Sequence, residues 1–147
     1  MTVGPSLLVV FDLDGTLADV EHRRHHVTGG NRRWDAFFAA AKDDPPVAAV
    51  IAAFHAMKAA GHEVQVWSGR SDAVRADTEA WLERHGLQPD RLIMRRARDN
   101  TPDDVLKESW LDAADRKPDL VFDDRDKVVA MWRRRGVPCF QVAPGDF

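Results

Sequence analysis

The stretch from Val9 to Thr16 reads VVFDLDGT, an apolar run that ends in two aspartates. The run predicts a buried strand, with Asp12 and Asp14 at its carboxyl end. Residues i and i+2 of a strand point to the same face, which places the two carboxylates roughly 6 to 7 Å apart. Two negative charges at that separation repel each other and cost stability unless a positive group lies beside them. The sequence therefore predicts a positive partner at this strand end.

The composition is that of one soluble globular domain, and we expect residues 1–147 to form it. Of the 147 residues, 44% are hydrophobic and 31% are charged, and the net charge is -3, which argues against a disordered tail and against a histone-like sheath for nucleic acid. The first ten residues, MTVGPSLLVV, lack the basic segment of a secretory signal. The single cysteine, Cys139, cannot form an internal disulfide. We therefore expect a cytoplasmic protein without a membrane segment.

Short apolar runs alternate with amphipathic stretches along the chain, which predicts strands and helices in turn. The apolar runs are Leu7 to Phe11, Val64 to Trp67, Arg91 to Met94, Leu120 to Phe122 and Val137 to Val142. The helical stretches are Val47 to Ala60, Ala73 to His85, Pro102 to Ala114 and Lys127 to Arg135, and glycines 61, 86 and 136 follow three of them. This alternation predicts an α/β fold, a five-stranded parallel sheet with helices on both faces.

Local signals refine this outline at three places. Residues 18–46 fit neither period, so we expect a lid there, a loop with a short helix near Trp34, over the strand ends. Thr101 is expected to cap the next-to-last helix, with Pro102 at its first position. Asp126 is expected to cap the last helix before Lys127.

Polar groups follow three of the predicted strands, at the edge of a parallel sheet where ligands bind. These residues are, in chain order, Asp12, Asp14, Ser68, Gly69, Arg70, Asp123 and Asp124. Clustered carboxylate oxygens without a nearby histidine or cysteine pair favour a hard divalent cation, most simply Mg²⁺. A metal at this edge supplies the positive partner that the first strand end requires.

The same edge carries groups suited to phosphate. Ser68 can donate a hydrogen bond, the backbone of Gly69 allows close approach, and Lys107, one turn after Asp103, can neutralise phosphate oxygens. An aspartate beside Mg²⁺ can attack phosphorus and form an aspartyl-phosphate. A second aspartate two residues later can protonate the leaving oxygen and then activate water. The residues therefore favour phosphoryl transfer.

In order along the chain, the motifs DLDGT, Ser68, Lys107 and the Asp123-Asp124 pair resemble the four motifs of the haloacid dehalogenase (HAD) superfamily of phosphotransferases. The stretches VWSGRSD, TPDDVLKE and DDRDKVVAMWRRRGVPCFQVAPGDF are similar to the phosphatase domain of phage polynucleotide 5′-kinase/3′-phosphatases. This similarity covers nearly the whole chain and is poor from about Val27 to Pro45.

The resemblance implies a Rossmann-like HAD fold and a polynucleotide 3′-phosphatase. Such an enzyme removes a 3′-phosphate, or opens a 2′,3′-cyclic phosphate, at a DNA or RNA end during repair. No GxxxxGK[ST] motif occurs, so we expect a phosphatase module without a kinase domain. A separate kinase or ligase chain is a candidate partner.

The resemblance also assigns roles by position. It makes Asp12 the nucleophile, Asp14 the general acid and base, and Ser68 and Lys107 further catalytic groups. It implies substrate contacts from Arg23, or from its neighbour Arg24, and from Gly69 and Arg70, with Asp103 orienting Lys107. It implies a Mg²⁺ site made by Asp12, Asp14, Asp123 and Asp124.

Two other functions stay open on the residues alone. A small-molecule HAD phosphatase such as a nucleotidase fits the same motifs, because the motifs do not choose the substrate. A receiver-type signalling module also phosphorylates an aspartate beside Mg²⁺. In receivers, however, an acidic pair comes first and no second aspartate follows the phosphorylated one, whereas here the order is reversed and Asp14 is present.

Aromatic and basic side chains leave further alternatives. Phe37 and Phe38 at helical spacing favour packing of the lid on the core, whereas Trp34 could either pack or stack on a base. The basic residues Arg91, Arg95, Arg96 and Arg98 could follow a polynucleotide backbone or form a solvated face.

Overall fold

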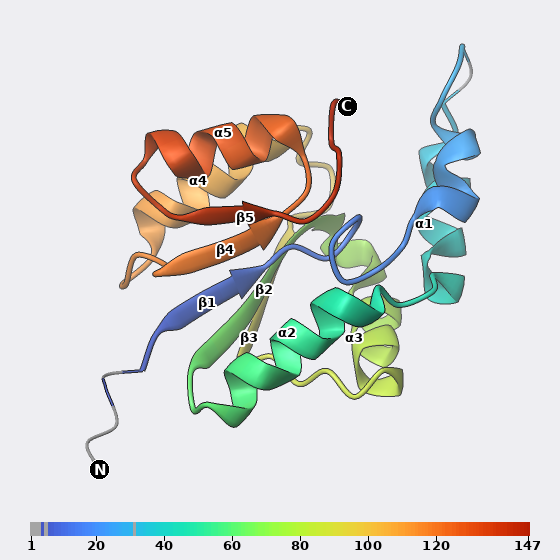
Figure 1. Ribbon diagram of the computed structural model, residues 1–147. Helices are drawn as coiled ribbons and strands as arrows, with labels where there is room; N and C mark the ends of the chain where they lie inside the picture. The colour runs from blue at the N-terminus through green and yellow to red at the C-terminus, as the bar shows by residue number, and fades with distance from the viewer. Residues whose placement is uncertain (1–3, 5, 31) are drawn as a thin grey trace.

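The computed structural model describes residues 4, 6–30 and 32–147 and contains one five-stranded parallel sheet (Figure 1). Its strands are β1 (Leu8–Phe11), β2 (Glu63–Ser71), β3 (Arg91–Arg95), β4 (Leu120–Asp123) and β5 (Cys139–Gln141), in the order β3-β2-β1-β4-β5. The predicted α/β class with a five-stranded parallel sheet is confirmed. Met1 to Val3 and Pro5, on which part of the expectation of no secretory signal rests, lie outside the described residues, as does Asn31 of the predicted lid.

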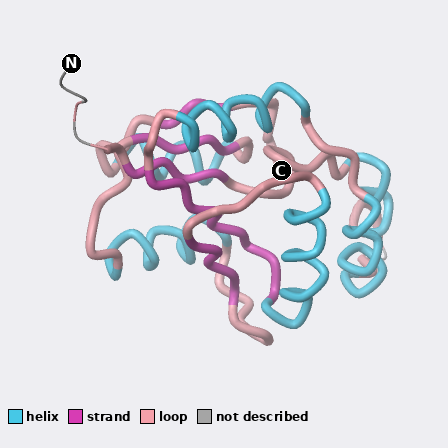
Figure 2. Tube along the Cα trace, turned by 90° about the horizontal axis from the view of Figure 1, so that it is seen from below, coloured by secondary structure: helices cyan, strands magenta, loops and turns pink. Residues whose placement is uncertain are grey.

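Helices cover both faces of the sheet (Figures 1 and 2). They are α2 (Ala48–Ala59) and α3 (Arg75–Arg84) on one face, and α4 (Asp103–Ala113) and α5 (Asp126–Arg134) on the other. Alternation along β1 explains this arrangement, because Val9 and Phe11 pack with α2 and α3 whereas Leu8 and Val10 pack with Leu111 of α4 and with α5. None of the helices in the described parts of the chain has the length and apolarity that crossing a membrane requires.

Three of the predicted helix ends are confirmed at glycines. Gly61, Gly86 and Gly136 have φ angles of 86°, 69° and 74°, and each lies within two residues of the end of a helix. The left-handed backbone there is favourable for glycine because it has no Cβ. Each of these helices is followed by a connection to the next strand.

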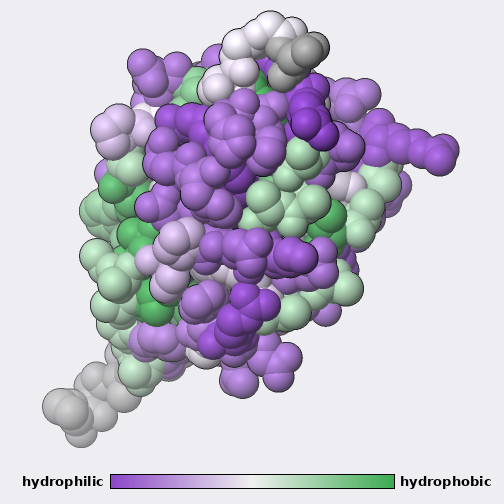
Figure 3. Space-filling view, turned by 90° about the vertical axis from the view of Figure 1, so that its right-hand side faces the viewer, coloured by the Kyte–Doolittle hydropathy of each residue, from purple (hydrophilic) through white to green (hydrophobic). Residues whose placement is uncertain are grey.

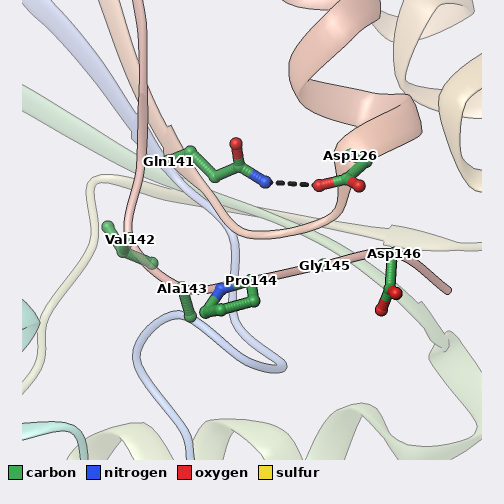
Figure 4. A pocket seen from close by; sticks show the side chains of 7 residues that line it. All are labelled: Asp126, Gln141, Val142, Ala143, Pro144, Gly145 and Asp146. Atoms are coloured by element: carbon green, nitrogen blue, oxygen red, sulfur yellow. Dashed lines mark hydrogen bonds between the residues drawn. The ribbon is translucent and has the colours of Figure 1, made fainter.

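Both predicted helix caps are wrong. Pro102, not Thr101, precedes α4, and the hydroxyl of Thr101 donates to Asp99 Oδ1 at 2.6 Å. Asp126 is already inside α5, where its Oδ1 accepts from Gln141 Nε2 at 2.6 Å (Figure 4). Each polar side chain is engaged by a partner that a capping rule does not consider.

The predicted lid consists of three short helical segments, η1 (Glu21–His26), α1 (Trp34–Ala39) and η2 (Ala40–Asp43). Isolated bridges join Ala18 to Asp14 and to Pro46, so the two ends of the lid meet close to β1. In Figure 1, α1 stands beyond the carboxyl ends of the strands. The lid therefore lies on the side of the molecule where the polar strand ends gather.

Candidate active site

Three buried carboxylates meet where β1 and β4 end, and we call Asp12, Asp123 and Asp124 the acidic cluster. One oxygen from each lies within 4.8 Å of the others. Lys107 of α4 donates from Nζ to Asp12 Oδ1 at 2.9 Å and to Asp123 Oδ2 at 3.1 Å. Three acids facing one lysine leave an excess of negative charge in a buried place.

The pKa values in the acidic cluster reflect this imbalance. Burial and the charge of Asp123 raise the pKa of Asp12 well above its ordinary value, although Lys107 acts in the opposite direction. Burial raises the pKa of Asp124 to about 6. Burial alone would lower the pKa of Lys107, but the charges of Asp12 and Asp123 raise it above its ordinary value, so the lysine stays protonated. The cluster thus offers oxygen ligands and lacks positive charge, as a site for a hard divalent cation would.

The two residues after Asp14 complete the floor of the acidic cluster. Gly15 has a φ of 79°, and a Cβ on it would lie 2.0 Å from Asp124 Oδ2. Thr16 donates its hydroxyl toward Asp12 Oδ2 at 3.3 Å and is within 3.4 Å of Asp124 Oδ1. In the DGT part of the opening motif, Gly15 therefore lets the backbone lie against the Asp124 carboxylate, and Thr16 supplies a hydroxyl contact to Asp12.

Asp14 belongs to a second group, which we call the arginine–aspartate cluster: Asp14, Arg23, Asp44 and Arg70. Asp14 Oδ1 accepts from Arg23 Nη2 at 2.9 Å and from Arg70 Nη2 at 2.6 Å. Asp44 accepts from Arg23 Nε at 2.8 Å and from Arg70 Nη2 at 3.2 Å. Two acids and two arginines balance each other, and the side chains of Arg23, Asp44 and Arg70 are buried.

The balance is visible in the pKa of Asp14. Burial alone would raise this pKa, but the guanidinium groups of Arg70 and Arg23 lower it below its ordinary value. The carboxylate of Asp14, predicted among the metal ligands, therefore faces two arginines instead of joining the acidic cluster. The i, i+2 spacing has placed the two carboxylates in different surroundings.

Asp44 is the residue that sequence analysis missed. It comes at the end of the lid, directly before Pro45, and its side chain is fully buried. Besides the two arginines, His22 Nε2 lies 2.6 Å from its Oδ1, and Trp81 Nε1 donates to its carbonyl oxygen at 2.9 Å. The only signal in the sequence is an acid before a proline, and that signal does not tell buried Asp44 from its exposed neighbour Asp43.

The remaining predicted residues lie near the two clusters. Ser68 is buried and its Oγ accepts from the backbone N–H of Arg70 at 3.1 Å. A Cβ on Gly69 would lie 2.6 Å from Asp103 Oδ1. Asp103 accepts from Arg95 Nη2 at 2.6 Å and from Arg125 at 3.1 Å. Among the described residues Lys107 has no hydrogen bond to Asp103, although the charge of Asp103 contributes to raising the lysine's pKa, so the orienting role of Asp103 stays a prediction.

Arg95 is a fixed part of the site wall. Besides Asp103, it donates to the carbonyl oxygens of Gly69 at 2.8 Å, Asp99 at 3.0 Å and Thr101 at 2.6 Å. These bonds hold the connection between β3 and α4 against the end of β2. Arg95 therefore fixes a loop of the protein, and it is neither a solvated residue nor free to follow a polynucleotide backbone. Arg98, by contrast, is exposed.

Residues of both clusters and of the Arg95 loop line one cavity of about 680 Å³. Asp12, Asp14 and Lys107 lie at its floor, and the lid supplies an aromatic wall made by Trp34, Phe37 and Phe38. Phe37 and Phe38 are half-buried and face this cavity as well as each other. The side of the molecule that carries α1 is mainly hydrophilic, with separate apolar patches (Figure 3).

Comparisons with known proteins agree with this geometry. Residues 6–147 match the family described as the polynucleotide kinase PNKP phosphatase domain. Two solved structures, of a Pnkp1/Rnl/Hen1 complex and of the Pnkp1/Rnl/Hen1 RNA repair complex, contain chains 32% and 30% identical to this one, with TM-scores of 0.82 and 0.80. They match 98% and 99% of this chain, which covers 48% and 47% of theirs, so it spans about half their length.

A more distant structure shares the fold alone. The class C acid phosphatase from Bacillus anthracis is 18% identical, with a TM-score of 0.69, over 97% of this chain and 69% of that one. The shared architecture extends across almost the whole chain.

Proposed function

The chain belongs to the HAD-superfamily phosphatase domains of polynucleotide kinase PNKP, and on that premise we propose that it is a Mg²⁺-dependent phosphomonoesterase acting on the 3′-phosphate of DNA or RNA ends. One observation carries the proposal. A cluster short of positive charge and a cluster rich in guanidinium groups meet at one cavity, where Asp12 and Asp14 lie two positions apart on the loop after β1. Together they suit a cation and a phosphate group.

The proposed metal ligands are Asp12, Asp123 and Asp124. Their oxygens converge within 4.8 Å, their surroundings raise the pKa values of Asp12 and Asp124, and the donor set contains only oxygens among the described residues. These properties fit Mg²⁺. When bound, the ion would neutralise charge on phosphate oxygens.

Asp12 is the proposed nucleophile. Its carboxylate oxygen would bond to phosphorus while the bond from phosphorus to the 3′-oxygen breaks, and Asp14 would give its proton to that oxygen. In the second half, water attacks the phosphorus of the aspartyl-phosphate and Asp14 takes the proton, which releases phosphate and restores Asp12. Lys107, with Nζ 2.9 Å from Asp12, would stabilise negative charge in both halves.

The state of Asp14 fits the second half directly. Arg70 and Arg23 lower its pKa, so it is ionised and able to accept a proton from water. In the first half it must carry a proton, and a substrate phosphate that takes hydrogen bonds from Arg70 would favour this. Arg70 lines the cavity and is the proposed phosphate contact, together with Ser68 and the backbone of Gly69.

The roles of Arg23 and Asp103 change under this proposal. Arg23 is buried behind Asp14 and is directed at Asp14, at Asp44 and at a lid carbonyl, so we assign it to holding Asp14 rather than to touching phosphate. Asp103 holds two arginines of the cavity wall.

Biological context is part of the proposal as well. The Pnkp1 chains come from an RNA repair complex, and we propose RNA or DNA end repair for this chain too, with partner chains that supply kinase or ligase activity. The lone Cys139 is buried, which suits a reducing cytoplasm.

The test is a substrate panel at matched concentrations, with Mg²⁺ and with chelator. It compares 3′-phosphate, 5′-phosphate and 2′,3′-cyclic ends on single strands, duplexes and mononucleotides, with Asp12→Asn as the inactive control. We expect the highest kcat/KM on 3′-phosphorylated oligonucleotides and none in chelator. Preference for free 5′-mononucleotides would support a nucleotidase instead, and a lasting phosphoenzyme without turnover would support a receiver-type module.

A further inference from the structure

Two large aromatic side chains that line the cavity are exposed, Trp34 and Phe147, and Trp34 is the one that belongs to the lid. Trp34 has 48% of its surface accessible, although it lies on the first turn of α1 and lines the same cavity as Asp12 and Asp14. Of the other four tryptophans, Trp67, Trp81 and Trp132 are fully buried in the core and Trp110 is half-buried. The Trp34 side chain is therefore accessible from the cavity, whereas the buried tryptophans pack in the core.

The ring of Trp34 is supported from behind by its own helix. Positions 34, 37 and 38 of a helix lie on one face. The Trp34 ring meets Phe37 edge-on at 5.7 Å and lies nearly parallel to Phe38 at 6.1 Å, and the two phenylalanines meet at 5.5 Å. The three rings form a packed unit, which we call the aromatic wall.

Arg23 fixes the aromatic wall relative to the reacting groups. Its Cζ lies 4.1 Å from the centre of the Phe37 ring, and its Nη1 donates to the carbonyl oxygen of Phe37 at 3.2 Å. The same guanidinium donates from Nη2 to Asp14 Oδ1 at 2.9 Å. One buried side chain thus contacts both Asp14 and Phe37 of the aromatic wall.

Basic residues flank the aromatic wall on the open side of the cavity. Arg32, two residues before Trp34, and Arg98, on the connection after β3, both line the cavity and are exposed. Neither takes part in an ion pair within the described part of the chain. Guanidinium groups beside an exposed aromatic ring suit a ligand that combines flat rings with phosphates.

We infer that Trp34 stacks on the base of the nucleotide whose 3′-phosphate reaches Asp12, and that Arg32 and Arg98 face the phosphodiester on the 5′ side of that nucleotide. This inference rests on the proposed function and names the part of the substrate that the lid recognises. A nucleobase fits better than an apolar peptide because the wall opens onto a phosphate site and carries a basic rim. Stacking is tolerant of sequence, so any of the bases is accepted.

The test compares an oligonucleotide 3′-phosphate with the same oligonucleotide whose terminal nucleotide lacks its base. In the full chain with Mg²⁺, removal of the base should lower kcat/KM by about 5- to 100-fold, the range of base–aromatic stacking. In Trp34→Ala this dependence on the base should shrink to less than about 2-fold, and Trp34→Phe should restore part of it. The matched control is Phe140→Ala, an aromatic residue 55% exposed on β5, which should keep the wild-type dependence.

The outcomes separate the inference from the proposed function. If the wild type removes the 3′-phosphate from both substrates at equal rates, or if Trp34→Ala remains as sensitive to the base as the wild type, the stacking assignment is overturned and the 3′-phosphatase stands. If the wild type acts on neither substrate but hydrolyses free 5′-mononucleotides, the proposed function fails first. Restored dependence in Trp34→Phe shows that an aromatic ring, and not the fold of α1, carries the effect.

Discussion

The acidic cluster and the arginine–aspartate cluster meet at one cavity, through Asp12 and Asp14 of the same loop, yet they are electrically opposite. In the first, three carboxylates face one lysine, and the pKa of Asp12 rises well above its ordinary value. In the second, two carboxylates face two arginines, and the pKa of Asp14 falls. Two aspartates with a single residue between them therefore lie in surroundings of opposite charge balance.

The two clusters differ in whether the chain itself supplies the positive charge that their carboxylates require. The arginine–aspartate cluster satisfies its own charges and is complete as folded. The acidic cluster has an uncompensated charge that an external cation can relieve. Mutations in the two clusters should therefore have opposite effects on stability in the absence of metal.

The largest effect should come from Asp12→Asn. An amide is a poor nucleophile and a poor ligand, so turnover should fall by about 10⁴-fold or more. In chelator at neutral pH the same variant should be more stable to urea than the wild type by about 1 to 2 kcal/mol, because a like charge is removed. The matched Asp14→Asn should instead be less stable, because it deprives Arg23 and Arg70 of an ionised partner. Equal changes in stability in the two variants would show that the two clusters do not differ in charge balance.

A second large effect should come from Asp44→Ala. It leaves two buried guanidinium groups facing a single carboxylate, which should lower the free energy of unfolding by about 3 to 5 kcal/mol. Asp43→Ala, the exposed neighbour, should change stability by less than about 0.5 kcal/mol. Urea unfolding of both variants measures the contrast. A mild effect at Asp44 would mean that the cluster relaxes without it.

A smaller effect concerns pH in the absence of metal. The folded-state pKa of Asp124 is raised from 3.8 to about 6, so the folded state binds more protons than the unfolded state between these values, and stability falls as pH rises through that window. From pH 5 to pH 7 in chelator, this group should cost about 1 to 2 kcal/mol. Saturating Mg²⁺ should remove the loss, and Asp124→Asn in chelator should lack the share that Asp124 contributes, whereas Asp12, whose pKa is also raised, keeps a share of its own. Asp14, with a lowered pKa, should contribute stability that is lost only at more acidic pH. Thermal unfolding at pH 5, 6 and 7 measures this loss, and a slope as steep in Asp124→Asn as in the wild type would assign the loss to groups other than Asp124.

The smallest effect should distinguish two hydroxyl groups, one bonded to each cluster. Thr16 donates toward Asp12, whereas Thr78 accepts from Arg70 Nη1 at 3.2 Å. Thr16→Val should raise the Mg²⁺ concentration for half-maximal activity by about 2- to 10-fold, the worth of one hydrogen bond. Thr78→Val should leave this concentration unchanged. A Mg²⁺ titration of activity compares them, and a shift in both or in neither would show that the hydroxyls do not report on separate clusters.

The sheet and the acidic cluster can be predicted from the sequence because both follow from local patterns. The apolar run before Asp12 defines β1, and the rule that parallel strands deliver their ends to one edge brings Asp123 and Asp124 to the same place. Lys107 follows from helical spacing and the resemblance. Nothing in these arguments requires knowledge of the lid.

The arginine–aspartate cluster was beyond such reasoning. Asp44 comes from an irregular segment of the lid, where no period indicates which face is buried. Its partners Arg23 and Arg70 come from the lid and from β2, so the cluster exists only after two distant segments have packed. The cap predicted at Asp126 failed for a related reason, since Gln141 reaches Asp126 from β5, whereas the cap predicted at Thr101 failed because Asp99, two residues earlier, takes its hydroxyl.

The central place of β1 also affects how the chain assembles during synthesis. β1 precedes both of its neighbours, and Val9 pairs with Val64 of β2 and with Leu120 of β4. Its second edge therefore stays open until most of the chain has left the ribosome, and such distant pairings close slowly. Asp12 gains its hydrogen bond from Lys107 only after 95 further residues have been synthesised. A nascent chain that stops before β4 would thus expose an apolar strand edge to other chains, the typical start of aggregation.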